Sequence, residues 1–134
     1  MNAETEQPLA GAPVISSYSR AQALEDGVLV DLTAWAKETG FTIPVACTAA
    51  VWSDWIAPTA EMRAYGQEER GRAHDLLWML YCAIRRAGKG DRIEFRVLFA
   101  QKPGKRPRSV ALKSVCGPGD AAEPVLTIML PNED

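Results

Sequence analysis

The spacing of apolar and polar residues predicts short helices in the first two thirds of the chain and strands in the last third. Ser19 and Gln22 have capping-box spacing, which predicts a short helix that runs to about Asp26. Gly27 then supplies the left-handed residue that ends a helix. The next three apolar residues, 28–30, are expected to form a short buried strand or extended segment.

Two more short helices are expected before residue 57. Asp31 can cap a helix that Gly40 ends. Residues 51–56 carry apolar side chains at i, i+1, i+4 and i+5, which form one stripe of a helix that Pro58 limits. We expect residues 57–67 to form a loop.

The longest predicted helix covers residues 68–88, and its acidic start and basic end suit the helix dipole. Apolar residues line one face of this helix and extend around much of its surface, so we expect it to be the buried spine of the fold. In residues 92–99 apolar and polar side chains alternate, and two further strand-like runs follow, one around Val110 and one from Pro124. These elements predict an α+β fold, with several helices packed on one face of a three- to four-stranded antiparallel sheet. The fourth strand would be residues 28–30.

Composition and charge are those of an ordinary globular protein. Of the 134 residues, 47% are hydrophobic and 24% are charged, and the net charge of -2 argues against a molecule that binds nucleic acid over its whole surface. Residues 1–13 are rich in Ala, Glu, Gln and Pro, so we expect a flexible tail followed by a single globular domain at 14–134. The chain has neither the pattern of a secretory signal nor a membrane-length apolar run, which predicts a cytoplasmic protein without a membrane partner.

The sequence gives little support for metal, cofactor or nucleophile chemistry. Cys47, Cys82 and Cys116 are widely spaced and odd in number, so we expect reduced thiols. His74 and Asp75 cannot pair directly, because adjacent helix residues point about 100° apart. We therefore expect no catalytic residue, no metal site and no cofactor.

Two polar clusters supply the candidate binding residues. Tyr18 and Arg20 lie beside hydroxyls just before a helix N-terminus, where an anion can bind, although capping by Ser19 is the simpler explanation. The turn QKPGKRPR can bind phosphates or an acidic protein surface, or its charges can simply keep the turn soluble. Its cations are Lys102, Lys105, Arg106 and Arg108. Most of the four tryptophans are expected in the core, and one that the fold exposes would mark an interaction hot spot.

The chain resembles an uncharacterised family of small bacterial proteins in three blocks. The blocks are ISSYSRAQALEDGVLVDLTAWAKETGFTIPVACTAAVW, HDLLWMLYCAIRRAG and VALKSVCGPGDAAEPVLTIMLPNED. Their order and spacing match from Ile15 onward, and members of the family are carried on conjugative plasmids and integrative elements. The resemblance implies an accessory role and supplies no catalytic or binding residue.

Three functional hypotheses follow. The leading one is a non-enzymatic accessory protein of a mobile element that binds a host protein. It would inhibit a defence complex such as a CRISPR or restriction system, with the sheet face and hairpin tip as its contact surface. The second is a small enzyme acting on a nucleotide or nucleic acid, which requires Tyr18, Arg20 and an acidic residue such as Asp31 to converge in a concave pocket. The third is a DNA-binding regulator that uses the basic hairpin. The oligomeric state is left open.

Overall fold

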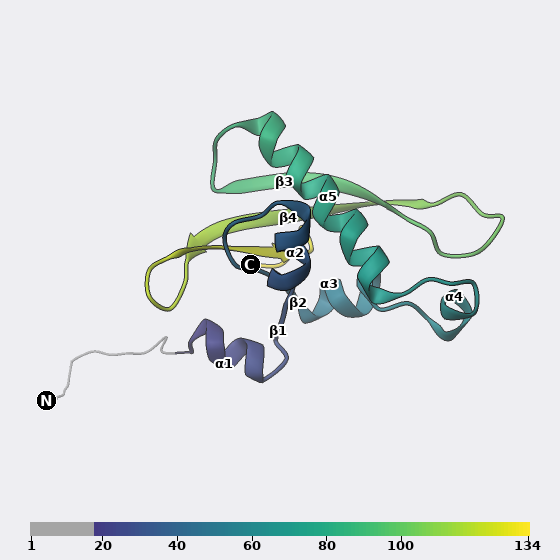
Figure 1. Ribbon diagram of the computed structural model, residues 1–134, viewed down its shortest axis with the longest axis horizontal. Helices are drawn as coiled ribbons and strands as arrows, with labels where there is room; N and C mark the ends of the chain where they lie inside the picture. Colours follow the sequence, from purple (N-terminus) through teal and green to yellow (C-terminus); the bar gives the residue numbers. More distant parts are fainter. Residues whose placement is uncertain (1–17) are drawn as a thin grey trace, which may run out of the picture.

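A mixed five-stranded sheet lies at the centre of the computed structural model, which describes residues 18–134 (Figure 1). Its strands are β1 (Leu29–Asp31), β2 (Val45–Thr48), β3 (Arg92–Phe99), β4 (Arg108–Pro118) and β5 (Pro124–Met129). Their order across the sheet is β1-β2-β5-β4-β3. The β2–β5 pair is parallel and the other three pairs are antiparallel. The predicted α+β class is confirmed.

The predicted antiparallel meander is confirmed for β3, β4 and β5, and the segment expected as a fourth strand pairs as β1. The sheet is nevertheless larger than predicted and is not purely antiparallel, because β2 inserts between β1 and β5. The first three side chains of β2 are all buried, so this strand lacks the alternation that identifies a half-exposed strand. Its parallel partner also lies far along the chain, where local patterns give no information on pairing.

Four helical segments cover one face of the sheet. They are α2 (Thr33–Thr39), α3 (Ala49–Val51), the π-helix η1 (Trp52–Ile56) and α5 (Glu69–Ala87). Alternate strand residues such as Phe95, Val97 and Leu112 join the fully buried Leu76 and Leu77 of α5 in one hydrophobic core. One face of the long helix therefore packs in the core as predicted, but its other side is exposed, so the prediction of a buried spine is confirmed for one face only.

Helix α1 (Arg20–Glu25) lies against the opposite face, so the prediction that the helices pack on one face is wrong for α1. Leu126 and Ile128 point into the helix-covered core, so Thr127 between them points the other way. The guanidinium of Arg20 bonds to the Thr127 hydroxyl, which fixes α1 on that side. Figure 1 accordingly shows α1 apart from α2 and α5.

The C-terminal residues provide polar partners for a buried lysine. The ammonium group of Lys113 donates to the carbonyl oxygens of Pro131 and Glu133. The Glu133 carboxylate accepts from the Leu130 amide at 2.7 Å and from the Thr48 hydroxyl at 2.8 Å. Because these bonds pair the buried charge within the protein, Lys113 has a structural role.

The predicted start of the first helix and the predicted glycine stops of the first two helices are confirmed. Ser19 forms the predicted capping box. Gly27 and Gly40 follow α1 and α2 with φ values of 80° and 127°, a region that favours glycine. The N-cap residue of α2 is Leu32, which forms no side-chain cap bond, so the predicted cap at Asp31 is off by one residue. The Asp31 carboxylate still accepts from the Thr33 amide at 3.0 Å. Both short helices thus end where the sequence predicts.

Residues 57–67 contain helix α4 (Ala60–Ala64), so the predicted loop is wrong in part. The Thr59 hydroxyl caps this helix by accepting from the Met62 amide at 3.2 Å. A helix of five residues makes little more than one turn, so an apolar period cannot reveal it. Residues 51–56 are helical as predicted, but most of them form the wider π-helix η1.

Two further expectations concern the N-terminal tail and membrane-spanning helices. The predicted tail at 1–13 lies outside the described residues. Among residues 18–134, no helix combines the length and the apolar character that crossing a membrane requires.

Candidate functional site

The N-terminal cluster forms contacts within the fold. The Tyr18 hydroxyl donates to the Asp26 carboxylate at 2.8 Å, and this bond raises the pKa of Tyr18. The Arg20 guanidinium donates to the Thr127 hydroxyl at 2.8 Å and to the Leu126 carbonyl oxygen at 2.9 Å. Tyr18 and Arg20 therefore point to different partners, and Arg20 ties α1 to the sheet.

A shallow cavity of about 210 Å³ lies beside Arg20. Asp31, Asp120 and Glu123 also line it, whereas Tyr18 does not. The Asp120 carboxylate accepts from the backbone amides of Arg20 and Ala21, and these bonds lower the pKa of Asp120. Three carboxylates around one engaged guanidinium repel a phosphate. The convergence that the nucleotide-enzyme hypothesis requires is therefore not found in this cluster.

The basic hairpin tip between β3 and β4 is exposed. Its cations are Lys102, Lys105, Arg106 and Arg108. None of them forms an ion pair within the part of the chain that the structure describes. The Arg108 guanidinium lies 5.4 Å from the centroid of the Trp55 ring, a cation–π contact that orients it. The tip therefore presents positive charge to solvent.

The three cysteines are free thiols, and the single histidine lies on the surface. All three cysteines are unpaired, and burial raises the pKa of Cys47 to about 12, so its thiol stays protonated at neutral pH. His74 is exposed on α5. No group of three His, Cys, Asp or Glu side chains suited to a metal ion is present among residues 18–134.

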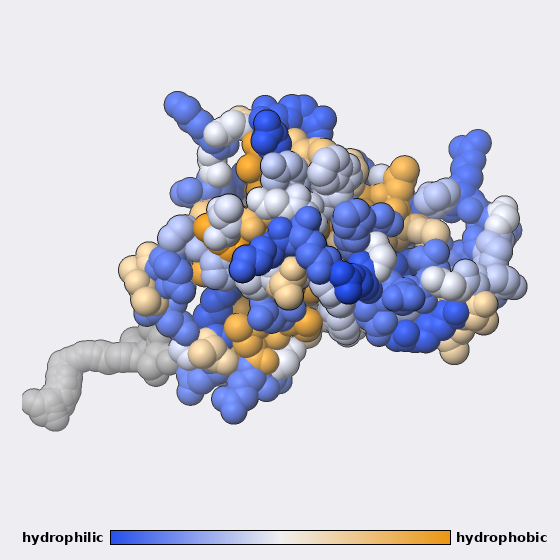
Figure 2. All heavy atoms as spheres, viewed as in Figure 1, coloured by the Kyte–Doolittle hydropathy of each residue, from blue (hydrophilic) through white to orange (hydrophobic). Residues whose placement is uncertain are grey.

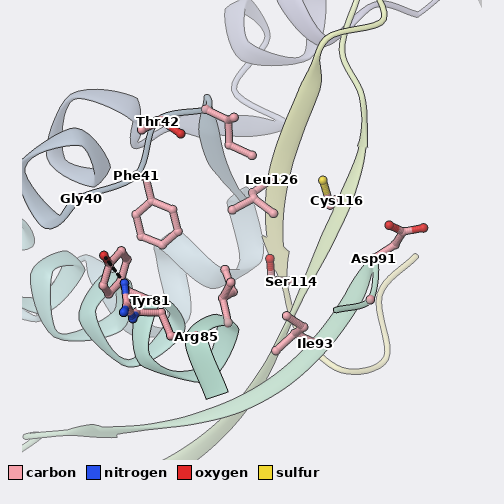
Figure 3. Close-up of a pocket in the computed structure, with 13 residues that line it drawn as sticks. Gly40, Phe41, Thr42, Tyr81, Arg85, Asp91, Ile93, Ser114, Cys116 and Leu126 are labelled. Carbon is pink, nitrogen blue, oxygen red and sulfur yellow. Dashed lines mark hydrogen bonds between the residues drawn. The ribbon is translucent and has the colours of Figure 1, made fainter. Parts of the chain in front are cut away.

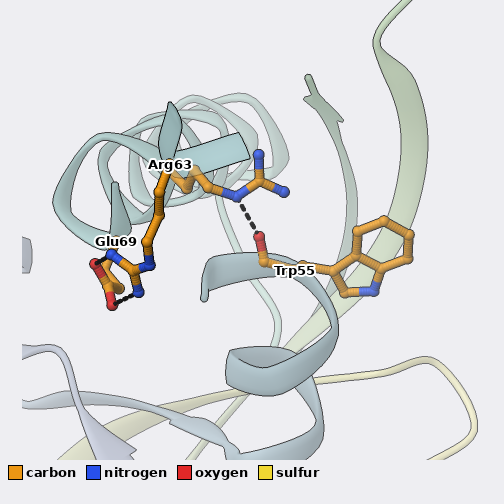
Figure 4. Close-up of polar contacts among 4 residues, drawn as sticks. Trp55, Arg63 and Glu69 are labelled. Carbon is orange, nitrogen blue, oxygen red and sulfur yellow. Dashed lines mark hydrogen bonds and ion pairs between the residues drawn. The ribbon is translucent and has the colours of Figure 1, made fainter. Parts of the chain in front are cut away.

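Arg72 of α5 is buried, and its guanidinium donates hydrogen bonds to backbone carbonyl oxygens within the protein. It is 2% exposed and donates to the carbonyl oxygens of Trp55 at 2.8 Å and Ala100 at 2.6 Å. Figure 4 shows the Trp55 carbonyl accepting at the end of η1, where the carbonyls of a helix lack partners within the helix. The guanidinium also lies 5.0 Å from the centroid of the Phe99 ring. Arg72 therefore joins α5, η1 and the end of β3.

The exposed side of α5 carries a different arrangement, which we call the aromatic–arginine ladder: Trp78, Tyr81 and Arg85. The Trp78 and Tyr81 rings are stacked, with centroids 5.8 Å apart and an interplanar angle of 16°. The Arg85 guanidinium lies 5.7 Å from the Tyr81 centroid and donates to the Tyr81 hydroxyl at 3.3 Å. Trp78 is 49% exposed, and the neighbouring Met79 is 38% exposed. The ladder thus presents an indole and a cation to solvent in a fixed arrangement.

Sequence reasoning did not identify this ladder. Apolar residues occur around most of the α5 cylinder, so the sequence does not distinguish the exposed Trp78 from buried neighbours such as Leu77. The available signal was the spacing of Trp78, Tyr81 and Arg85 at i, i+3 and i+7, which places them on one side of a helix.

On the rest of the surface, Figure 2 shows the hydrophobic residues of the viewed face in small separate groups rather than in one continuous patch.

The fold is α+β, and the aromatic–arginine ladder is exposed on α5. The chain belongs to the Family of unknown function (DUF6573), which it matches over residues 6–134. No curated protein and no solved structure matches the chain.

Proposed function

We propose that this protein is a non-enzymatic accessory protein that acts by binding a host protein. The aromatic–arginine ladder is the observation that carries the proposal. Trp, Tyr and Arg are the residue types most enriched at the energetic centres of protein interfaces. Because Trp78 already stacks on Tyr81, and Arg85 already lies over the same ring, little side-chain freedom is lost on binding.

The chemistry of the ladder indicates the kind of surface that fits it. Met79 extends the apolar area beside Trp78, and Arg85 and Arg86 add positive charge at the end of the helix. A matching surface offers an apolar pocket for the indole with acidic residues at its edge. The basic hairpin tip provides positive charge for a second contact with the same partner.

We further propose that the partner belongs to a host defence complex, such as a CRISPR or restriction system, and that binding inhibits it. This narrower step is supported by the resemblance to proteins of conjugative plasmids and integrative elements, whose accessory genes often counter host defence. It rests on that genomic setting, whereas the binding function rests on the ladder.

Affinity capture from host lysate with quantitative mass spectrometry tests the binding function. The bait proteins are the wild type, Trp78→Ala and the control Tyr65→Ala, which removes another exposed aromatic ring outside the ladder. We expect one protein or complex to be enriched by the wild type and the control, with a loss of about tenfold or more for Trp78→Ala. Equal capture by all three proteins, or no specific partner, contradicts the proposal.

A DNA-binding regulator is the second candidate, and the exposed cations of the hairpin tip favour it. Binding through phosphate contacts predicts a mobility shift that weakens steeply with salt. Replacing Lys105, Arg106 and Arg108 by Gln then removes the shift, because these residues supply most of the positive charge of the tip. Absence of a shift at low salt rules out this candidate.

A further inference from the structure

A cavity of about 320 Å³ opens beside Arg85, between α5, the segment after α2 and the sheet (Figure 3). Its wall is mostly apolar. The apolar lining residues include Phe41, Ile43, Ile84, Ile93 and Leu126. Small-molecule sites have volumes of about 300 to 1,000 Å³, so this cavity suits a ligand with about one ring-sized apolar group.

Ser114 contributes a buried hydroxyl to this apolar wall. It lies opposite Ile93 on β3 and Ile128 on β5, so its side chain points to the helix-covered face where the cavity lies. Ser114 is 2% exposed, and no side-chain hydrogen bond from it is formed within residues 18–134. Because a buried hydroxyl without a partner is unfavourable, the site is suited to a ligand atom that bonds there.

Arg85 supplies positive charge on the α5 side of the same cavity. One of its five N–H donors is directed to the Tyr81 hydroxyl, and no carboxylate pairs with it in the described part of the chain. Asp91 also lines the cavity, but Figure 3 shows it on the far side from Arg85. Donors of Arg85 therefore remain free for an anionic group of a ligand.

We propose that this cavity binds a small carboxylic acid with one ring-sized apolar group. The carboxylate pairs with Arg85, the apolar group fills the space between Phe41 and Leu126, and a polar atom at the far end bonds to the Ser114 hydroxyl. This site does not rest on the proposed function, because it requires no partner protein.

An NMR titration of the full chain with three probes tests the site. The probes are 3-(4-hydroxyphenyl)propionate, 3-phenylpropionate, which lacks the hydroxyl, and 4-(2-aminoethyl)phenol, which replaces the carboxylate by an ammonium group. We expect saturable shifts at the amides of Ser114, Ile93 and Leu126 with the hydroxylated acid. The acid without the hydroxyl should bind several-fold more weakly and the amine at least about tenfold more weakly, because a charge-assisted pair with Arg85 is lost.

Two pairs of variants assign the contacts. Ser114→Ala should remove the difference between the two acids, whereas Ser109→Ala, on the other face of the same strand, should keep it. Arg85→Gln should weaken binding of both acids by about tenfold, whereas Arg86→Gln, which does not line the cavity, should not. Amide spectra confirm that each variant is folded. The proposal is overturned if neither acid gives saturable shifts at these amides, or if the amine binds as tightly as the acids.

Discussion

Helix α5 holds two arginines over aromatic rings, and the two differ in what their donors meet. Arg72 lies over Phe99 near the start of the helix, where it is buried and bonded to two backbone carbonyls. Arg85 lies over Tyr81 near the end of the helix, where it is exposed and free of any carboxylate in the described residues. An arginine over an aromatic ring therefore stabilises the fold near the start of α5. Near the end of the helix, the same kind of contact leaves N–H donors for a ligand or a partner.

The largest effect on stability is expected when the Arg72 side chain is truncated. Arg72→Ala leaves the carbonyl oxygens of Trp55 and Ala100 without this donor and removes a packed side chain, so we expect the free energy of unfolding to fall by about 3 kcal/mol. Urea denaturation measures the change. Arg72→Lys is the matched variant, and it should lose less because its ammonium group keeps the charge and can still donate to a carbonyl oxygen. An unchanged stability in Arg72→Ala contradicts a structural role.

A substitution at Gly40 tests the close contact between this residue and the Tyr81 ring of the ladder. A Cβ at this position would lie 3.1 Å from a Tyr81 ring carbon, and the backbone φ of 127° is strained for any other residue. We expect Gly40→Ala to lower the free energy of unfolding by about 2 kcal/mol and to disturb Tyr81. The control Gly27→Ala also has a positive φ, which at 80° is closer to the left-handed region that other residues can reach. Nothing lies within 4 Å of its new Cβ, so it should lose about 1 kcal/mol. Equal losses in the two variants, together with unchanged NMR signals of the Tyr81 ring in Gly40→Ala, contradict a close contact between Gly40 and Tyr81.

Asp120 caps the start of α1, the helix that the Arg20 side chain joins to the sheet, because its carboxylate accepts from the Arg20 and Ala21 amides. Because backbone amides lower its pKa, the folded Asp120 binds a proton less readily than the unfolded chain. Its contribution to stability is therefore present above the unfolded pKa of about 3.9 and is lost as the pH falls through the lower folded pKa. The stability difference between the wild type and Asp120→Asn should be constant above about pH 5 and shrink below about pH 4. A difference that does not depend on pH contradicts this capping role.

The smallest effect on stability is expected for Arg85. Its exposed contact with Tyr81 is worth little to the fold, so Arg85→Ala should change the free energy of unfolding by less than about 0.5 kcal/mol. Thermal and urea denaturation of Arg85→Ala and Arg72→Ala under the same conditions compare the two losses in the free energy of unfolding. A loss as large as that of Arg72→Ala shows that Arg85 is also structural.

Local features of the fold were predictable from the sequence because their causes are local. The capping box at Ser19 and the glycine stop at Gly40 depend on residues within one turn. The place of β2 in the sheet depends on a partner near the other end of the chain, and the burial of Arg72 depends on Trp55 and Ala100, so no sequence pattern signals either.

The candidate site was less predictable than the fold. Tyr18 and Arg20 were singled out because they cluster before a helix, yet their partners Asp26 and Thr127 engage them within the fold. Trp78 is exposed because the other side of α5 packs on the sheet. The sequence does not show which side packs, because apolar residues occur around most of the helix. The expectation that an exposed tryptophan marks an interface stays a prediction.

Plasmid-transformation efficiency in hosts that carry a CRISPR or restriction system tests most directly the claim that the ladder inhibits a defence complex. The strains express the wild type, Trp78→Ala or the control Tyr65→Ala at equal levels. We expect the wild type and the control to raise transformation of a targeted plasmid, and Trp78→Ala not to raise it. Equal transformation with and without the wild-type protein, or full activity of Trp78→Ala, contradicts it.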